Sequence, residues 1–172
     1  MKIEKPGEGE YAPYAIRYIG LLPDDGLVLR HMEENLEATR EFILSLPEER
    51  LAYRYAEGKW TIKEILVHVS DDERIYAYRA LRFARGDKTE LPGFEQDDYA
   101  AHSGAGGRDI KDILREFAAV RQATISLFEG LDREALVRVG VADGKVMSVR
   151  AAAYHIAGHE LRHVDIIRER YL

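Results

Sequence analysis

The chain has 172 residues, 46% of them hydrophobic and 33% charged, which is the balance of one globular domain over residues 1–172 and excludes global disorder. Its 31 acidic and 25 basic side chains give a formal net charge of −6, so we do not expect nucleic acid as a partner. Because the chain has no cysteine, disulfides, thiolate metal sites and cysteine nucleophiles are excluded. The N-terminus lacks a signal-peptide pattern and no run of about 18 apolar residues occurs, so we expect a cytoplasmic protein that does not bind membranes.

Residues 1–22 are rich in Gly, Pro and Tyr, which predicts an irregular N-terminal arm. Its tyrosines, which either lie on the surface or fill a groove, are Tyr11, Tyr14 and Tyr18. The first helix is predicted over 24–46, where apolar side chains recur at three- and four-residue steps. Asp24 or Asp25 is expected to cap its start, and Pro47 follows its end.

The second helix is predicted over 61–85, because Thr61 and Glu64 form the T-x-x-E pattern of a capping box. The third is predicted over 108–130 from a stripe of apolar side chains at helical spacing. The glycine-containing stretch 87–107 between them is expected to be a long loop that crosses the bundle or lines a pocket.

The fourth helix is predicted over 148–171. Before it, alternating valines flank Asp143-Gly144, which is a strong hairpin signal. We therefore expect a small β-hairpin over 137–147, between the third and fourth helices. Four long amphipathic helices with little strand predict an all-α four-helix bundle.

Histidines are the chemically notable side chains of the last helix. The six histidines of the chain are His31, His68, His102, His155, His159 and His163. The last three share one helix face, because steps of four residues drift by only about 40° around a helix. His159 and His163 fall within the apolar stripe, where buried imidazoles need hydrogen-bond partners or a shared metal ion. Together with His68, at the margin of the apolar stripe of the second helix, they would form an open metal site of three imidazoles.

Several neighbouring residues allow two interpretations. We expect His31 and His102 on the surface or in loops, and His155 either as an extra ligand or as a residue lining a pocket. Each ligating imidazole needs an acceptor for its other N–H. Acidic candidates near in sequence are Asp71, Asp72, Glu73 and Glu160. Alternatively, residues 71–73 form a solvated helix face, and the basic run 79–85 pairs with carboxylates of the first helix.

Residues 159–163, H-E-L-R-H, also fit the zinc-peptidase pattern, in which Glu160 would be the general base. Two features argue against a peptidase. The chain ends at Leu172 without offering a third ligand after the pattern, and only the 137–147 hairpin could provide an edge strand for a peptide substrate. The peptidase therefore remains a minor alternative.

Two stretches, 59–87 and 146–172, resemble the DinB-like superfamily, above all its DinB-2-type members, and the resemblance extends from near Leu29 to the C-terminus. The first stretch carries H-x-x-D-x-E and the second G-H-E-x-x-H; the matching residues are His68, Asp71, Glu73, Gly158, His159, Glu160 and His163. The resemblance implies a four-helix bundle, a frequent homodimer, and a divalent metal ion, zinc or nickel in related proteins. It also implies the ligands of that ion, which are His68, His159 and His163. The chain departs from the family at Arg162, where members often have a further histidine.

Some related proteins transfer low-molecular-weight thiols, such as bacillithiol or mycothiol, to electrophiles. The resemblance and the histidines together predict a metal-dependent enzyme that acts on a small molecule, either by transferring such a thiol or by hydrolysis with metal-activated water. Glu160 and Asp71 are the candidate catalytic residues, which would move protons. The alternative is a non-enzymatic, stress-related bundle that binds a metal or a ligand without turnover.

Overall fold

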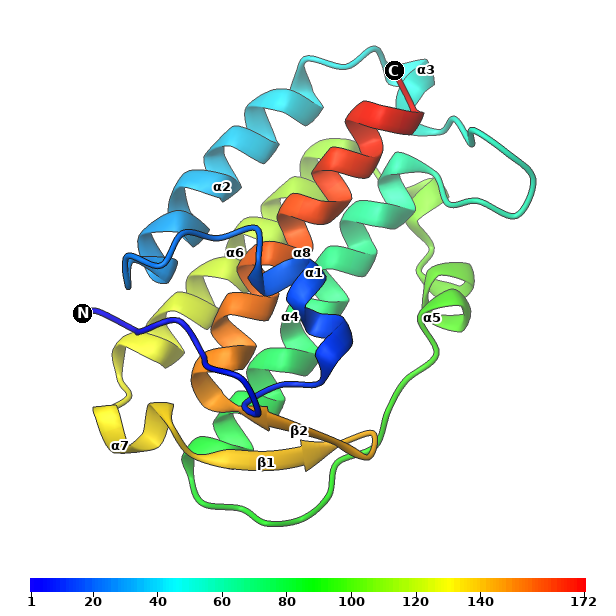
Figure 1. Cartoon of the computed structure of the whole chain (residues 1–172). Coiled ribbons are helices and arrows are strands. Elements are labelled where there is room, and N and C mark those ends of the chain that lie inside the picture. The colour runs from blue at the N-terminus through cyan, green and yellow to red at the C-terminus, as the bar shows by residue number, and fades with distance from the viewer.

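Four long helices lie side by side in the computed structural model, which describes residues 1–172 (Figure 1). They are α2 (Val28–Leu44), α4 (Ile62–Ala84), α6 (Ile110–Glu129) and α8 (Val149–Arg170). Helix α4 packs against α6 and α8, and α2 packs against the same two helices, so the four close around one interior. This arrangement confirms the predicted all-α four-helix bundle.

Six short helical segments were not expected from the sequence. They are η1 (Pro13–Ala15), α1 (Ile16–Ile19), α3 (Glu48–Leu51), α5 (Gln96–His102), η2 (Ala105–Gly107) and α7 (Arg133–Leu136). The arm 1–22 is therefore not irregular throughout, and the stretch 87–107 is not simply a loop. Segments this short show no repeated periodicity in sequence, and packing stabilises them: Ile19 of α1 and Ala105 of η2 are buried.

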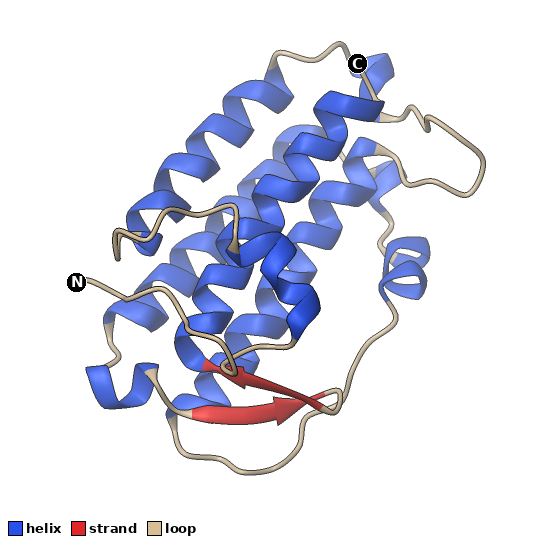
Figure 2. Cartoon of the chain, viewed as in Figure 1, coloured by secondary structure: helices blue, strands red, loops and turns tan.

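A small antiparallel hairpin closes one end of the bundle (Figure 2). Its strands are β1 (Val139–Ala142) and β2 (Lys145–Ser148), as predicted between the third and fourth helices. Asp143 and Gly144 have φ values of 53° and 67°, the two positive values that a type I′ turn requires. Leu91 adds to the edge of β1, since its N–H donates to the Val141 carbonyl at 3.0 Å.

The helix starts follow the capping residues. At α4 the Thr61 hydroxyl accepts from the Glu64 N–H at 3.1 Å, and the Glu64 carboxylate accepts from the Thr61 N–H at 2.7 Å, which confirms the capping box. At α2 the expected cap is wrong. The N-cap is Leu27, without a side-chain bond, and Asp25 accepts from the Leu27 N–H at 2.8 Å one step earlier.

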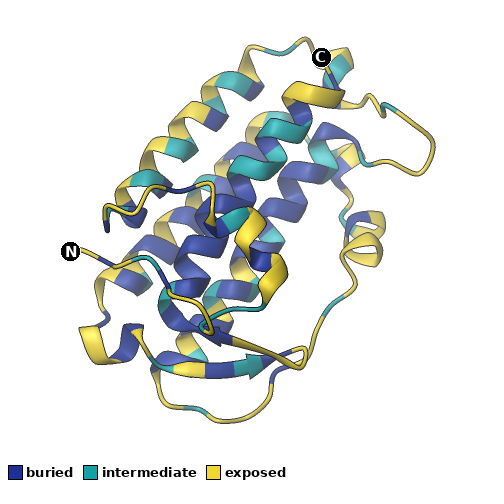
Figure 3. Ribbon diagram, in the orientation of Figure 1, coloured by how far each residue is buried: buried dark blue, intermediate teal, exposed yellow.

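Two hydrophobic clusters fill the interior, and a buried polar layer separates them. The larger cluster takes residues 76–84 of α4 and 149–157 of α8, towards the hairpin end. The smaller cluster takes residues 62–69 of α4 and Ile167 of α8, towards the opposite end. Between them the inward faces of the helices stay buried (Figure 3) but carry polar side chains. The polar residues of this layer are Thr39, His68, Asp72, Glu73, Arg121, His159 and Glu160.

None of the helices combines the length and the apolar character that a membrane-spanning segment needs.

Candidate metal centre

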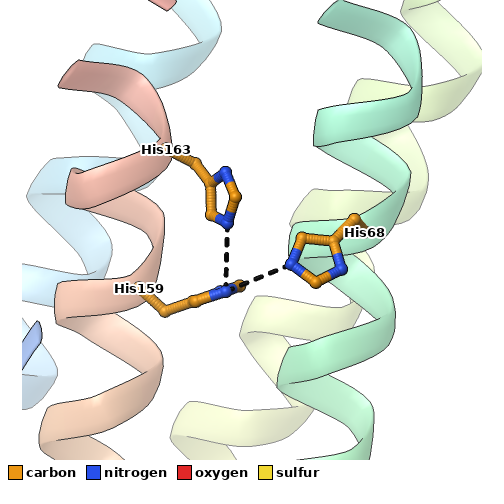
Figure 4. Close-up of side chains that lie close together, drawn as sticks. All are labelled: His68, His159 and His163. Atoms are coloured by element: carbon orange, nitrogen blue, oxygen red, sulfur yellow. Dashed lines mark hydrogen bonds between the residues drawn. The ribbon is translucent and has the colours of Figure 1, made fainter. Parts of the chain in front are cut away.

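Three imidazoles from two helices converge in the polar layer. His159 and His163 lie one turn apart on α8, and His68 reaches towards them from α4 (Figure 4). The Nε2 atom of His159 lies 3.2 Å from Nε2 of His68 and 3.1 Å from Nε2 of His163. The structure thus brings together the three residues that the sequence singled out as metal ligands, all within 4.8 Å of one another.

The spacing of these nitrogen atoms suits a metal ion better than hydrogen bonds. A neutral imidazole nitrogen either donates one proton or accepts at one lone pair, so Nε2 of His159 cannot satisfy both of its neighbours. Around a tetrahedral zinc ion with metal–nitrogen distances of about 2.0–2.1 Å, the nitrogens would lie about 3.3 Å apart. The observed separations are close to that value, so the donor set fits a divalent metal ion.

Burial also prepares the three rings as ligands. It holds the pKa of His159 well below the usual histidine value and lowers the pKa of His163 to about 3. The pKa of His68 is lowered by the same cause. The rings are therefore neutral near pH 7, and a neutral ring offers the lone pair that a metal ion needs.

Asp72 lies beside the rings of His159 and His155. Its Oδ2 atom lies 3.4 Å from Nδ1 of His159 and 3.1 Å from Nε2 of His155. Burial raises the pKa of Asp72, but the adjacent His159 and His155 outweigh burial and hold this pKa below its usual range. An ionised carboxylate beside Nδ1 of His159 favours the tautomer with the proton on Nδ1, which leaves the lone pair of Nε2 for a metal.

The interpretation of residues 71–73 as a solvated face is wrong for two of the three. Asp72 and Glu73 are only 4% and 1% exposed, because both point into the polar layer. Asp71, a candidate catalytic residue, instead pairs with the exposed Arg74 at 3.3 Å, and burial raises its pKa. It is not among the side chains that meet at the three imidazoles.

Glu160, the other candidate catalytic residue, is committed to a buried ion pair. Its Oε2 atom accepts from Arg121 at 2.8 Å, and its Oε1 atom accepts from the Thr39 hydroxyl at 2.7 Å. Burial raises the pKa of Glu160 even though Arg121 opposes that change. Both carboxylate oxygens of Glu160 are therefore bound by residues of α2 and α6. This argues against the peptidase alternative, in which Glu160 would act as the general base.

Sequence reasoning missed Arg121, which is fully buried and also binds Glu73 with Nε–Oε1 and Nη2–Oε2 distances of 2.9 Å each. A signal was present. Phe117, Arg121 and Ile125 lie at four-residue steps on the apolar stripe of the third predicted helix, where a lone arginine demands a buried partner.

Of the remaining histidines, only His155 lies next to the three imidazoles, with its ring centroid 5.4 Å from that of His159. His155 stacks its ring on Tyr76 with centroids 3.7 Å apart and pairs with Asp72. His31 pairs with Asp25 at 2.9 Å, and His102 is exposed on α5.

A cavity of about 300 Å³ opens onto the centre and is walled by His155, His159 and Asp72, together with Tyr14 and Tyr18 of the arm. Of the two places expected for the arm tyrosines, the surface or a groove, the structure shows all three lining this cavity, with Tyr14 also 40% exposed. The ring of Tyr18 lies edge-on to His155 and His159, at centroid distances of 4.9 and 5.3 Å. On the other side, a second cavity of about 560 Å³ reaches His163 past Trp60, whose ring lies 4.7 Å from that of His68.

The fold and the site together define the class of protein: a four-helix bundle with a candidate three-histidine metal site beside an open cavity. More specifically, the chain is a member of the DinB superfamily, whose pattern it matches over residues 31–167. That match contains all four long helices almost completely, and both histidine-bearing segments.

Two relatives illustrate the likeness. A protein of Oceanobacillus iheyensis named "Putative metal-dependent hydrolase OB0413" is 25% identical over 143 residues, which is 81% of each chain. The solved structure of YfiT from Bacillus subtilis, described as "a probable metal-dependent hydrolase with an unusual four-helix bundle topology", has a TM-score of 0.65 at 14% identity. The match covers 96% of this chain and 93% of the YfiT chain, and it supports the four-helix bundle fold.

Proposed function

We propose that the protein is a metal-dependent hydrolase of a small molecule, with His68, His159 and His163 as the metal ligands. The observation that carries this proposal is the convergence of three Nε2 atoms: that of His159, at the wall of a cavity, lies 3.2 Å from that of His68 and 3.1 Å from that of His163. The names of the two relatives support the same activity.

A divalent metal ion on neutral imidazoles acts as a Lewis acid towards an oxygen atom of water or substrate. Zinc and nickel both suit imidazole ligands. Three protein ligands leave room for a further ligand, as catalytic sites require.

Asp72 and His155 handle protons in this proposal. Because ionised Asp72 only accepts, Nε2 of His155 donates to it, and Nδ1 of His155 is buried without a hydrogen-bond partner. His155 also lines the cavity beside His159. We assign His155, held by Asp72 at the cavity wall, as the residue that accepts a proton from the attacking nucleophile, in place of Glu160 and Asp71.

The first experiment is metal analysis by mass spectrometry of the untagged protein after reconstitution with zinc or nickel. We expect about one equivalent in the wild type and little in His68→Ala and His163→Ala. His102→Ala, an exposed histidine of α5, is the matched control and should keep its metal. Metal that survives both ligand substitutions would rule out this site.

The second experiment separates hydrolysis from its rivals. Zinc-loaded protein is assayed with p-nitrophenyl acetate, and with chlorodinitrobenzene plus a low-molecular-weight thiol. We expect ester turnover that chelation abolishes, and a loss of at least about 100-fold in His155→Gln at unchanged metal content. Turnover only with the thiol would instead indicate the transferase, and a full metal complement without turnover on either probe would favour the non-enzymatic bundle.

A further inference from the structure

Arg79 is a buried arginine without a carboxylate partner. It lies on α4, is only 6% exposed, and none of the ion pairs of the structure includes it. Its one polar contact is from Nη2 to the Pro92 carbonyl at 3.0 Å. The expected pairing of the basic run 79–85 with the first helix is therefore wrong at this residue. Arg121, the other buried arginine, binds two carboxylates, which is the usual condition for burying such a charge.

Aromatic rings hold the Arg79 side chain in place without neutralising its charge. Its Cζ atom lies 5.0 Å from the ring centroid of Tyr76 and 6.0 Å from that of Phe94. Such cation–π contacts favour the guanidinium at this place and restrict its plane. They leave its donor fork without an anionic acceptor from the chain.

The same cavity that reaches the metal centre also reaches Arg79. Arg79, His155 and His159 all line it, and Tyr76 connects them, because its ring contacts Arg79 and stacks on His155 at 3.7 Å. A molecule that fills this space of about 300 Å³ would touch both the guanidinium and the histidines.

The other charges at the cavity do not neutralise Arg79. Asp143 is exposed and pairs with Lys145, which is the main cause of its lowered pKa; the charge of Arg79 adds to that lowering, but the two residues form no ion pair. Glu95 is exposed at the rim. Asp72 is buried at the far wall, where it pairs with His155 and His159. The unpaired positive charge at the Arg79 end is thus available to a ligand.

We infer that Arg79 binds the carboxylate of a small organic acid in this cavity, with the body of the acid extending towards His155 and His159. The planar fork of arginine matches a carboxylate with two parallel hydrogen bonds. The tyrosine walls, Tyr14, Tyr18 and Tyr76, suit a flat, largely apolar body. If this acid is the substrate, that role rests on the proposed hydrolase function. The binding of the acid by Arg79 does not depend on that function.

The test uses benzoate and benzamide, which share a shape and differ in charge, with protein treated with a chelator so that no metal ion can bind the carboxylate. Isothermal titration calorimetry should give benzoate binding at least about tenfold tighter than benzamide binding. Arg79→Met should weaken benzoate binding at least about tenfold, and Arg79→Lys, which keeps the charge but not the fork, should lie between. Arg82→Met, one turn further along α4 and outside the cavity, should change it less than about twofold.

Three results would overturn the assignment. They are equal binding of benzoate and benzamide, undiminished benzoate binding by correctly folded Arg79→Met or Arg79→Lys, and tighter binding of inorganic phosphate than of benzoate, which would replace the carboxylate by a phosphate. A failure of the hydrolase proposal can be distinguished from a failure of the Arg79 assignment by comparing two variants. His163→Ala, which should lose the metal, should retain Arg79-dependent benzoate binding, whereas Arg79→Met should retain the metal.

Discussion

Gly158, the residue before the first α8 metal-ligand candidate, sets how closely the arm approaches the centre. A Cβ atom at this position would lie 2.1 Å from the Tyr18 carbonyl oxygen, which is backbone and cannot turn aside. Only glycine lets α1 pack so tightly on α8, and this packing places the ring of Tyr18 against His155 and His159. The glycine of the G-H-E-x-x-H pattern is therefore part of the cavity wall.

We predict that Gly158→Ala destabilises the protein, although alanine normally stabilises a helix interior by about 1 kcal/mol relative to glycine. The clash with Tyr18 should outweigh that gain, with a net loss of about 1–3 kcal/mol in the free energy of unfolding measured with urea. Gly106→Ala is the matched control, since its Cβ would meet no atom within 4 Å. A stabilised Gly158→Ala protein would show that α1 does not pack here.

The candidate site was only partly predictable at this scale. Helical periodicity alone placed His159 and His163 on one face, because both belong to one helix. His68 lies 91 residues earlier than His159, and no spacing rule connects two helices. Its place at the margin of an apolar stripe suggested it as the third ligand, and the family resemblance strengthened that prediction. Nothing in the sequence marked Arg79, because its surroundings come from the loop and the hairpin.

At the scale of elements, predictability followed length. The four long helices repeat their apolar stripe over several turns, and each was predicted to within four residues of its observed ends. The hairpin was predictable from two residues, since Asp143-Gly144 dictates its own turn. Segments such as α1 and α5 depend on contacts with distant parts of the chain and carry no comparable local signal.

Arg150 fastens the arm to α8 beside the hairpin, through an ion pair with Glu10 and a longer one with Glu4 at 3.5 Å. Arg150 donates from Nε to Oε2 of Glu10 at 2.8 Å, and the Ser148 N–H donates to the Glu10 carbonyl at 2.8 Å. The bond from Arg150 is the main reason that the pKa of Glu10 falls from 4.5 to about 2. The arm carries Tyr14 and Tyr18 over the cavity, so this fastening positions the cavity wall.

The lowered pKa of Glu10 predicts how this fastening depends on pH. Its contribution to stability should be complete above about pH 4.5, the value in the unfolded chain, and should be lost as pH falls towards about 2. We expect Glu10→Gln to have a lower free energy of unfolding than the wild type in urea at about pH 6. This difference in the free energy of unfolding, the stability gap, should close on acidification. Glu8→Gln, an exposed neighbour, should show no gap at any pH. A Glu10→Gln gap that is constant with pH would contradict the ion pair.

At the scale of the whole molecule, the polar layer is one electrostatic unit that joins all four long helices. Arg121 on α6 binds Glu73 on α4, Glu160 on α8 and the Met32 carbonyl on α2. The layer holds three buried carboxylates and one guanidinium, because Asp72 lies against His155 and His159 while Glu73 and Glu160 bind Arg121. With all three carboxylates ionised and the imidazoles neutral, two negative charges of the layer have no cationic side chain to balance them. A divalent cation on the neutral imidazoles would bring the layer to neutrality, which is a second physical reason to expect a metal ion there.

Removing Arg121 should expose the cost of burying those carboxylates. We predict that Arg121→Met lowers the free energy of unfolding by about 3–5 kcal/mol at neutral pH, because Glu73 and Glu160 lose their shared partner. The deficit should shrink as pH falls, since an unpaired buried carboxyl group has a raised pKa and is tolerated once protonated. Arg115→Met, an exposed residue of the same helix, should change stability by less than about 0.5 kcal/mol. Adding Glu73→Gln and Glu160→Gln to Arg121→Met should recover much of the loss in urea denaturation, because the buried charges are then gone. An Arg121→Met protein as stable as the wild type would mean that the layer does not hold the bundle together.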